Sequence, residues 1–243
     1  MERAVETNID ALRNSRYPGR GIVIGRTPDA RHFVQVYWIM GRSAGSRNRV
    51  FVTDEQTVRT RAFDESVLEN PSLVVYRPIR VLNACHIVSN GDHTDTICDA
   101  IRGGGSFESA LNTRTFEPDP PIFTPRIAGI VDLDDSGAAY RIGILKALAG
   151  NGESASRQYF SYETAIPGIG HCITTYRDDG DPPPAFAGEP YAVELHDGIE
   201  TTRDFYWNLL DEANKISLLV KYIDAESGNT DLTIVNKYRQ LKC

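Results

Sequence analysis

Val88-Ser89-Asn90-Gly91-Asp92-His93-Thr94-Asp95-Thr96 joins a strand-like run, which ends at Val88, to a helix-like stretch at residues 94–101. Nearly every position has a side-chain donor or acceptor, and Gly91 permits positive φ or a close approach of the backbone to a ligand. A strand, a polar loop and a helix start commonly hold an anionic small molecule. The same residues also fit an Asx-rich turn with a Thr or Asp N-cap. Taken alone, the segment slightly favours the turn.

The sequence on either side of this loop predicts layers of strands and helices. Runs rich in β-branched and aromatic residues predict strands at 20–25, 33–40, 50–52, 57–62, 73–76, 79–88, 126–132, 138–145, 157–163, 171–176, 217–224 and 232–235. Apolar periodicity predicts helices at 3–14, 94–101, 106–112 and 201–214. Thr201 or Thr202 is the expected N-cap of the last helix. Many antiparallel strands with separately gathered helices indicate an α+β fold.

Composition and charge exclude several classes of protein. The chain has 243 residues, enough for one large domain, and a net charge of −7. That balance argues against nucleic acid or an anionic membrane as the main partner. We expect no membrane span, because no apolar run is long enough to cross a bilayer, and residues 1–6 lack the apolar core of a signal peptide. We therefore expect a cytoplasmic protein.

The cysteines and histidines do not predict a metal site. Cys85, Cys98, Cys172 and Cys243 show no CxxC spacing, so we expect reduced thiols, with Cys85 and Cys98 in the core. The histidines fit no metal-ligand spacing. A Pro-rich stretch at 178–184 is interpreted as a rigid loop and not as a domain boundary.

Arginines are concentrated in one short segment. Arg42, Arg47 and Arg49 lie within eight positions. A guanidinium binds phosphate through paired hydrogen bonds, so the cluster is compatible with a phosphate site. The alternative is a solvated basic hairpin paired with carboxylates at Asp54, Glu55 or Glu65. The residues alone support both interpretations equally.

Four segments in a fixed order carry a family resemblance. They are Tyr17-Pro18-Gly19-Arg20 with Gly25-Arg26, Arg42-Ser43 with Arg47-Asn48-Arg49, residues 89–97, and Thr124-Pro125-Arg126-Ile127-Ala128. They resemble the YxGR…GR, SRSxxNR, SNGxHTDTI and TPRIAA segments of the archaeal-type IMP cyclohydrolase family. Extra residues separate Ser43 from Asn48 here. The resemblance runs from about residue 17 to about residue 176.

The resemblance implies a fold and an activity. It implies a single domain at 17–243 after an N-terminal extension at 1–16, built as a four-layer α-β-β-α sandwich resembling the N-terminal-nucleophile hydrolases. Because the chain starts Met1-Glu2, we expect no processed N-terminal nucleophile. The implied reaction closes 5-formamidoimidazole-4-carboxamide ribotide into IMP, in purine biosynthesis. It needs a purine ribotide, no cofactor and no metal, and it is compatible with a homo-oligomer.

The resemblance also assigns residues. It places Arg49, Tyr76 and Glu117 at the reacting centre, although residues 116–121 hold one residue more before Thr124 than the family pattern. The implied substrate-binding residues are Arg20, Arg42, Ser43, Arg47, Asn48, Ser89, Asn90, Gly91, His93, Thr94, Asp95 and Arg126. For His93, a hydrogen-bonding role that orients the loop is favoured over proton transfer.

Two other functions remain open at this stage. The first is a related amide hydrolase or cyclase that acts on another nucleotide-like substrate. The second is a non-catalytic protein that binds purine ribotides through the loop and the arginines. Retention of Tyr76 and Glu117 beside the arginine cluster argues mildly for catalysis.

Overall fold

Antiparallel sheets packed face to face form the body of the protein. The computed structural model describes residues 1–54, 57–68 and 71–238, and within them two large sheets and a separate β-ribbon are present. The first sheet has the order β11-β10-β1-β2-β12-β13. Its strands are β1 (Gly21–Arg26), β2 (His32–Met40), β10 (Ile169–Thr174), β11 (Tyr191–Glu194), β12 (Lys215–Asp224) and β13 (Thr230–Asn236).

The second sheet has the order β5-β6-β7-β8-β9. Its strands are β5 (Ile79–Leu82), β6 (Cys85–Ser89), β7 (Arg126–Asp132), β8 (Tyr140–Ala147) and β9 (Ala155–Tyr162). The ribbon pairs β3 (Val50–Asp54) with β4 (Thr57–Arg61). Short helical turns complete the chain at α2 (Ala44–Arg47), η1 (Glu65–Val67), α3 (Pro71–Val74) and η2 (Leu148–Gly150).

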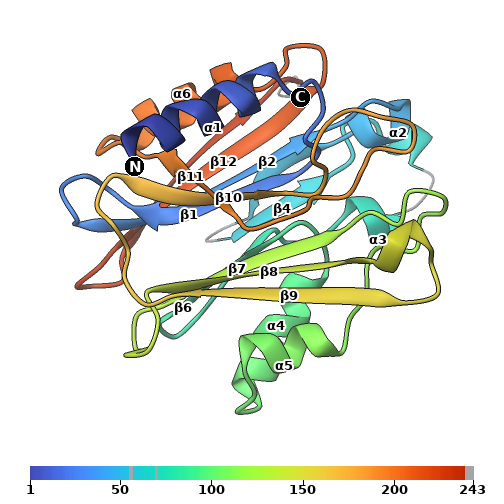
Figure 1. The fold of residues 1–243 in the computed structure, drawn as a ribbon. Helices are drawn as coiled ribbons and strands as arrows, with labels where there is room; N and C mark the ends of the chain where they lie inside the picture. Colours follow the sequence, from blue (N-terminus) through green and yellow to red (C-terminus); the bar gives the residue numbers. More distant parts are fainter. Residues whose placement is uncertain (55–56, 69–70, 239–243) are drawn as a thin grey trace.

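Helices cover the outer faces of both sheets (Figure 1). Helices α1 (Glu2–Asn14) and α6 (Ile199–Leu209) lie on the first sheet, where α1 contacts β11 and α6 contacts β12 and β13. Helices α4 (His93–Arg102) and α5 (Phe107–Asn112) lie on the second sheet. The layers therefore follow the order helix, sheet, sheet, helix, in agreement with the expected α+β class.

Strand alternation decides which side chains fill each interface. In β1, Ile22 and Ile24 face the second sheet, whereas Val23 faces the helices, and all three are fully buried. Each such side chain contributes roughly 1.5–3 kcal/mol on burial. Gly129 of β7 lets the sheets approach, because a Cβ there would lie 2.2 Å from Cδ1 of Ile24. The sheets are thereby fixed as a rigid support for the loops at their ends.

Several predicted elements need correction. Residues 73–76 are not a strand: α3 ends at Val74, favoured by Pro71 in its first turn. The strand predicted at 79–88 is a hairpin of β5 and β6, in which Asn83 takes a φ of 53°. Strand β11 and helix α2 were not predicted.

The last helix begins and ends earlier than predicted. Gly198 is its N-cap, and α6 stops at Leu209 instead of residue 214. Thr202 lies inside the helix, where its hydroxyl forms a 2.6 Å hydrogen bond with the hydroxyl of Tyr222. The predicted Thr cap is therefore wrong, because the Thr202 hydroxyl is used between the helix and the sheet.

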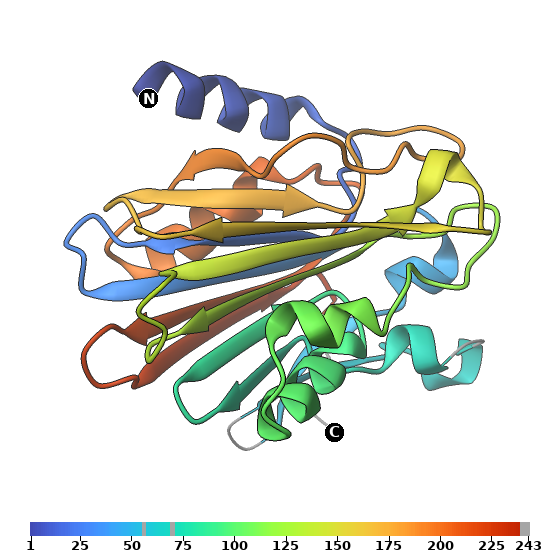
Figure 2. The ribbon, with the colours of Figure 1, turned by 60° about the horizontal axis from the view of Figure 1, so that its bottom comes forward.

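The thiols agree with the expected reduced state. Cys85, Cys98 and Cys172 are buried and free, and Cys243 lies outside the described residues. No helix in the described part of the chain is long and apolar enough to span a membrane. Figures 1 and 2 both place α2 and α3 at the same end of the sandwich, and this end carries the candidate site.

Candidate active site

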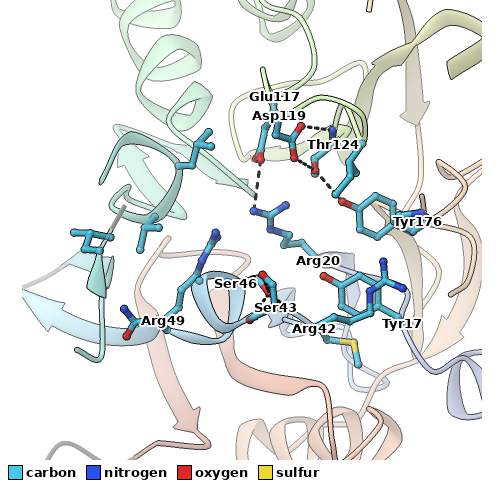
Figure 3. Close-up of a pocket in the computed structure, with 18 of the residues that line it drawn as sticks. Tyr17, Arg20, Arg42, Ser43, Ser46, Arg49, Glu117, Asp119, Thr124 and Tyr176 are labelled. Atoms are coloured by element: carbon cyan, nitrogen blue, oxygen red, sulfur yellow. Dashed lines mark hydrogen bonds and ion pairs between the residues drawn. The ribbon is translucent and has the colours of Figure 1, made fainter. Parts of the chain in front are cut away.

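A cavity of about 340 Å³ lies at this end of the sandwich, where the turns around α2 and α3 meet the loop that precedes β7. Cationic, acidic, aromatic and apolar side chains together line it (Figure 3). Its polar lining includes Tyr17, Arg20, Arg42, Ser43, Ser46, Asn48, Arg49, Glu117, Asp119, Thr124 and Tyr176. The volume is within the range of small-molecule sites.

Arg49 is the cation of this cavity whose donors are most clearly unused. It follows the C-cap of α2, and only 6% of its surface is exposed. Its Nε and Nη1 atoms are buried and have no hydrogen-bond partner among the described residues. Burial and the neighbouring charge of Arg20 lower the pKa of Arg49, but a guanidinium stays protonated in proteins. A buried charge without a partner is costly, so these donors indicate a ligand with acceptor oxygens.

Arg20 and Glu117 form a buried pair in the same wall. Arg20 precedes β1, and its Nη2 lies 3.5 Å from Oε2 of Glu117. The backbone N–H of Glu117 donates to the carbonyl of Thr124 at 2.9 Å, which fixes the loop. Burial raises the pKa of Glu117, and the charges of Arg20 and Arg126 oppose that rise. A carboxyl with a raised pKa suits proton transfer near neutral pH.

Two tyrosines lie behind these charges. The hydroxyl of Tyr76 lies 2.6 Å from that of Tyr37 on β2, and both side chains are buried. Burial raises the pKa of Tyr37 well above its usual value. Tyr76 is not among the residues that line the cavity, but it is within electrostatic range of Arg20 and Arg49. The pair can therefore supply a hydroxyl proton to the charged wall.

A second group of polar side chains forms the other rim. The guanidinium of Arg42 lies 4.6 Å from the ring centroid of Tyr17, pairs with Asp179 and donates to the carbonyl of Gly180 at 2.7 Å. Ser43 caps α2 through a capping box with Ser46. Arg42 and the two hydroxyls can bind an anionic group at the mouth of the cavity.

The other members of the arginine segment differ in placement. Arg47 does not line the cavity: its Nε donates to the carbonyl of Gly41 at 3.0 Å and its Nη2 to Oδ1 of Asn214 at 3.2 Å. Asn48 lines the cavity and also exchanges two 2.7 Å hydrogen bonds with the backbone of Asp64.

One carboxylate of the basic-hairpin alternative has its partner outside the arginine segment. Glu65 pairs with Arg61 at 2.9 Å, which makes Glu65 a partner of the ribbon. Glu55 lies outside the described residues.

The polar loop from Ser89 to Asp95 does not line this cavity. Nδ2 of Asn90 donates to the carbonyl of Pro125 at 2.9 Å, and its Oδ1 accepts from the N–H of Ile127 at 2.8 Å. The hydroxyls of Ser89 and Thr94 bond to each other and to the carbonyl of Gly91. The buried polar side chains of the loop thus hold it against β7.

His93 is fully buried in this network. Its Nε2 lies 3.0 Å from the carbonyl oxygen of Ile127, and its Nδ1 lies 3.2 Å from Nη1 of Arg126. Burial, reinforced by the charge of Arg126, lowers the pKa of His93 to about 3. A neutral histidine with both ring nitrogens engaged can orient its neighbours through hydrogen bonds.

Arg126 connects the loop to the cavity. Its Nη1 donates to Oδ1 of Asp92 at 2.7 Å, and its charge opposes the rise that burial causes in the pKa of Glu117. Asp92 also accepts two hydrogen bonds from Arg114, at 2.7 and 2.6 Å, whereas Asp95 pairs with Arg80. Gly91 leaves room for this arrangement, because a Cβ there would lie 2.7 Å from Nη1 of Arg126.

Sequence reasoning missed part of the cavity wall. The hydroxyls of Thr124 and Tyr176 lie 2.8 Å apart and form a hydrogen bond (Figure 3). The backbone N–H of Thr124 donates to Oδ1 of Asp119 at 2.7 Å. Tyr17 stacks on Tyr176 with 5.6 Å between ring centroids. Tyr17 and Thr124 stand inside the quoted motifs and were discoverable. The sequence pattern gave Tyr176 only a place in the strand predicted at 171–176.

The described residues contain no group of three or more His, Cys, Asp or Glu side chains placed to hold a metal ion. The cavity instead offers guanidinium, hydroxyl and carboxyl groups. Chemically, it can hold an anionic ligand, stabilise negative charge that develops on an oxygen, and move a proton.

Comparisons with known proteins agree with this chemistry. A family model described as IMP cyclohydrolase-like protein matches residues 17–228. Three relatives named IMP cyclohydrolase come from Methanothrix thermoacetophila, Methanococcus maripaludis and Methanocaldococcus jannaschii. They are 37%, 30% and 30% identical, over 53%, 51% and 51% of this chain. The alignments cover 62%, 62% and 61% of these relatives, which is less than two thirds of their length. Because the family model spans most of the chain, this protein belongs to the IMP cyclohydrolase-like family.

Proposed function

We propose that this protein closes 5-formamidoimidazole-4-carboxamide ribotide into IMP in the cavity around Arg49. Family membership supports the reaction, and relatives that carry the name IMP cyclohydrolase match about half of this chain. The observation that carries the proposal is the pair of buried donors on Arg49 that have no hydrogen-bond partner in the described part of the chain. They supply what the reaction needs most, a fixed positive charge for an oxygen that becomes negative.

The reaction sets three requirements. The carboxamide nitrogen attacks the formyl carbon and a C–N bond forms. The formyl oxygen then leaves as water with one proton from that nitrogen and one from the formamide nitrogen, which becomes part of the new C=N bond. The formyl oxygen gains negative charge before it leaves, so donors must point at it. The weakly nucleophilic nitrogen must lose a proton. The two reacting groups must also be held in contact, because ring closure depends on conformation.

The residues of the cavity meet these requirements in our proposal. Arg49 donates to the formyl oxygen, and the hydroxyl of Tyr76 supports the developing charge or returns a proton to the leaving oxygen. Glu117 receives the nitrogen proton, directly or through water, since burial raises its pKa. Arg20 keeps Glu117 in place across the 3.5 Å contact.

The phosphate is assigned to the mouth of the cavity. Arg42 supplies the charge there, and Ser43 and Ser46 supply hydroxyls. Loop residues 89–95 contribute through Arg126, which they position beside Glu117. We also propose that the layered fold is of the N-terminal-nucleophile hydrolase type, with a site that uses these internal side chains.

An ultraviolet assay of IMP formation with the purified full chain tests the activity. We expect turnover without added nucleotide and equal rates with and without a chelator, since the proposed roles are all filled by side chains. Thermal unfolding with and without IMP provides a parallel measure of binding. Binding without turnover would contradict the proposal in favour of a ribotide-binding protein. Absence of both would favour a related cyclase or amide hydrolase with a different substrate.

A further inference from the structure

A second cavity, of about 700 Å³, lies at the opposite end of the space between the sheets. Strand β2 connects the two ends: Met40 lines the first cavity, and Gln35 lies near the second. At about 3.3 Å per residue, these positions are roughly 16 Å apart along the strand. The second cavity is bounded by the β5–β6 hairpin, the β12–β13 turn and residues of the β3–β4 ribbon. It reaches the surface at Val81 and Leu232, which are 49% and 37% exposed.

Polar side chains of both sheets meet at the inner wall of this cavity. Nζ of Lys221 on β12 lies 2.8 Å from Nδ1 of His86 on β6. Gln35 is the register partner of Lys221 on β2, and its Nε2 donates to the carbonyl of His86 at 2.9 Å. Lys221 is 2% exposed and Gln35 is fully buried. A core between two sheets has no packing need for an amine, an imidazole and an amide, so their presence calls for another use.

This cluster has an unfilled hydrogen bond. Oε1 of Gln35 is buried and has no partner among the described residues. The bond from Nε2 to the His86 carbonyl fixes which side of the amide carries the oxygen. The free acceptor therefore calls for a donor that the described residues do not provide.

The charge balance around Lys221 is equally unusual. Among the described side chains that line the cavity, the titratable or charged ones are Arg80, His86 and Lys221, with no carboxylate. Arg80 is paired with Asp95. Burial lowers the pKa of Lys221 to about 7. Burial and the charge of Lys221 lower the pKa of His86 to about 3.

Lys215, on the same strand, shows the ordinary alternative. It is also buried, at 5% exposed, but its Nζ lies 2.6 Å from Oε2 of Glu212 and 4.5 Å from the ring centroid of Trp207. A carboxylate and an aromatic face hold an ammonium in its charged form. Among the described residues, Lys221 has neither kind of partner. A desolvated amine beside a neutral imidazole is a nucleophile.

We propose that the second cavity is a ligand site in which the amine of Lys221 binds a small aldehyde as a reversible imine. The nitrogen attacks the carbonyl carbon, forming a C–N bond and a carbinolamine. The carbinolamine hydroxyl can donate to Oε1 of Gln35. Loss of the carbonyl oxygen with both amine protons, as water, then leaves the C=N bond, so the step needs no oxidant or reductant. His86 holds the amine through Nδ1 and directs its lone pair into the cavity.

Trapping with pyridoxal and borohydride tests the proposal on the intact chain. The lysines are Lys146, Lys215, Lys221, Lys237 and Lys242, so peptide mass spectrometry can assign the adduct. At pH 8 and limiting pyridoxal, we expect Lys221 to be modified at least about tenfold faster than Lys215. The neutral fraction of an amine with a pKa of about 7 exceeds that of an ordinary lysine by on the order of 10²-fold at that pH.

The pH dependence and two variants provide the controls. Between pH 8 and pH 7, modification of Lys221 should fall only about twofold, against about tenfold for an ordinary lysine. Lys221→Arg keeps the charge and should lose the adduct at that position, whereas Lys215→Arg should leave it unchanged. Folded wild-type protein whose adducts lie on the other lysines, or whose Lys221 reacts no faster than Lys215, would overturn the proposal. This wild-type comparison decides the matter even if Lys221→Arg fails to fold.

Discussion

The loop from Ser89 to Asp95 and the cavity wall around Arg49 are both rich in polar side chains, but they use them in opposite ways. In the loop, Asn90 and His93 have bonds to the backbone on or before β7. In the wall, Nε and Nη1 of Arg49 are buried and have no hydrogen bond to any residue that the structure describes. A satisfied network stabilises one backbone conformation, whereas unused buried donors are costly until a ligand fills them.

This contrast distinguishes the loop, which supports the fold, from the cavity wall, which is the candidate site. The loop fixes Arg126, and Arg126 acts on Glu117, so its influence on the cavity is indirect. Arg49 meets the cavity directly. Substitutions in the wall should therefore affect turnover more than stability, and substitutions in the loop should do the reverse.

The largest effect on turnover is expected at Arg49. Replacing it with Met should lower kcat for ring closure by roughly 10²–10³-fold, because a donor to the developing oxyanion is lost. The melting temperature should stay the same or rise, since an unpaired buried charge is removed. Steady-state kinetics and calorimetry measure the two changes. Arg126→Met is the matched control: it should lower stability, because Asp92 loses one of its two arginine partners and Nδ1 of His93 loses its contact with Nη1. If Arg49→Met unfolds the protein while turnover per folded molecule is kept, the contrast fails.

The next effect is expected at Tyr76. Tyr76→Phe keeps the ring and its packing, so the fold should survive, and kcat should fall by roughly 10²-fold if the hydroxyl meets the charge on the formyl oxygen. The KM should change far less. Tyr37→Phe is the control that removes the partner hydroxyl while Tyr76 is retained. A near-normal rate in folded Tyr76→Phe would remove Tyr76 from the mechanism and move the search toward His93 and Asp95.

A smaller effect distinguishes Arg42 from Arg47. Arg42 lines the cavity, so Arg42→Ala should weaken binding of the ribotide about tenfold or more, in line with roughly 1.5–3 kcal/mol for a charge-assisted contact. Binding of the phosphate-free riboside should change less. The sequence motif alone predicts the same loss for Arg47→Ala, whereas the bonds of Arg47 to Gly41 and Asn214 predict a similar, small loss for both ligands. Titration calorimetry with both ligands decides between them. An equal loss for ribotide and riboside in Arg42→Ala would show that Arg42 does not contact the phosphate.

The smallest effect on turnover is expected in the loop, where stability should depend on pH. Histidines titrate near pH 6.5 when unfolded, but burial lowers the pKa of His93 and of His86 to about 3. The unfolded state binds more protons between these values, so the free energy of unfolding should fall as pH drops below 6.5. Each histidine contributes up to about 1.4 kcal/mol per pH unit.

Urea unfolding at pH 7, 6 and 5 measures this slope. His93→Gln removes the titrating ring, so it should reduce the slope by one histidine's share and leave kcat at pH 7 within about twofold. A slope that is unchanged in the variant, or a large loss of kcat with the fold intact, would give His93 a chemical role instead.

The sequence could predict those parts of the fold that depend on local pattern. Alternation of apolar residues predicted β1, β2, β7 and β8, and periodicity predicted α1. Prediction from the sequence failed where tertiary contacts override the local preference of a segment. Residues 73–76 have strand-forming side chains, but Pro71 starts a helical turn and Tyr76 then pairs with Thr60 through its backbone. Thr202 fits a cap by sequence and bonds to Tyr222 in the fold.

The site shows the same limit. The sequence motifs could identify both Arg49 and Asn90 as candidate site residues, because both are polar residues within the matched segments. Only packing shows that the nitrogen and the oxygen of the Asn90 amide both have hydrogen bonds, and that two donors of Arg49 have none among the described residues. Tyr37, which pairs with Tyr76, is 39 positions away in the sequence and could not be linked to it without the sheet.

A crystal structure of the protein with IMP bound would test the central claim most directly. The account predicts the purine in the cavity of about 340 Å³, with an oxygen acceptor within hydrogen-bond distance of Nε or Nη1 of Arg49 and the phosphate beside Arg42. The loop from Ser89 to Asp95 should keep its internal bonds. IMP bound to the side chains of that loop, with the donors of Arg49 still unused, would contradict the account.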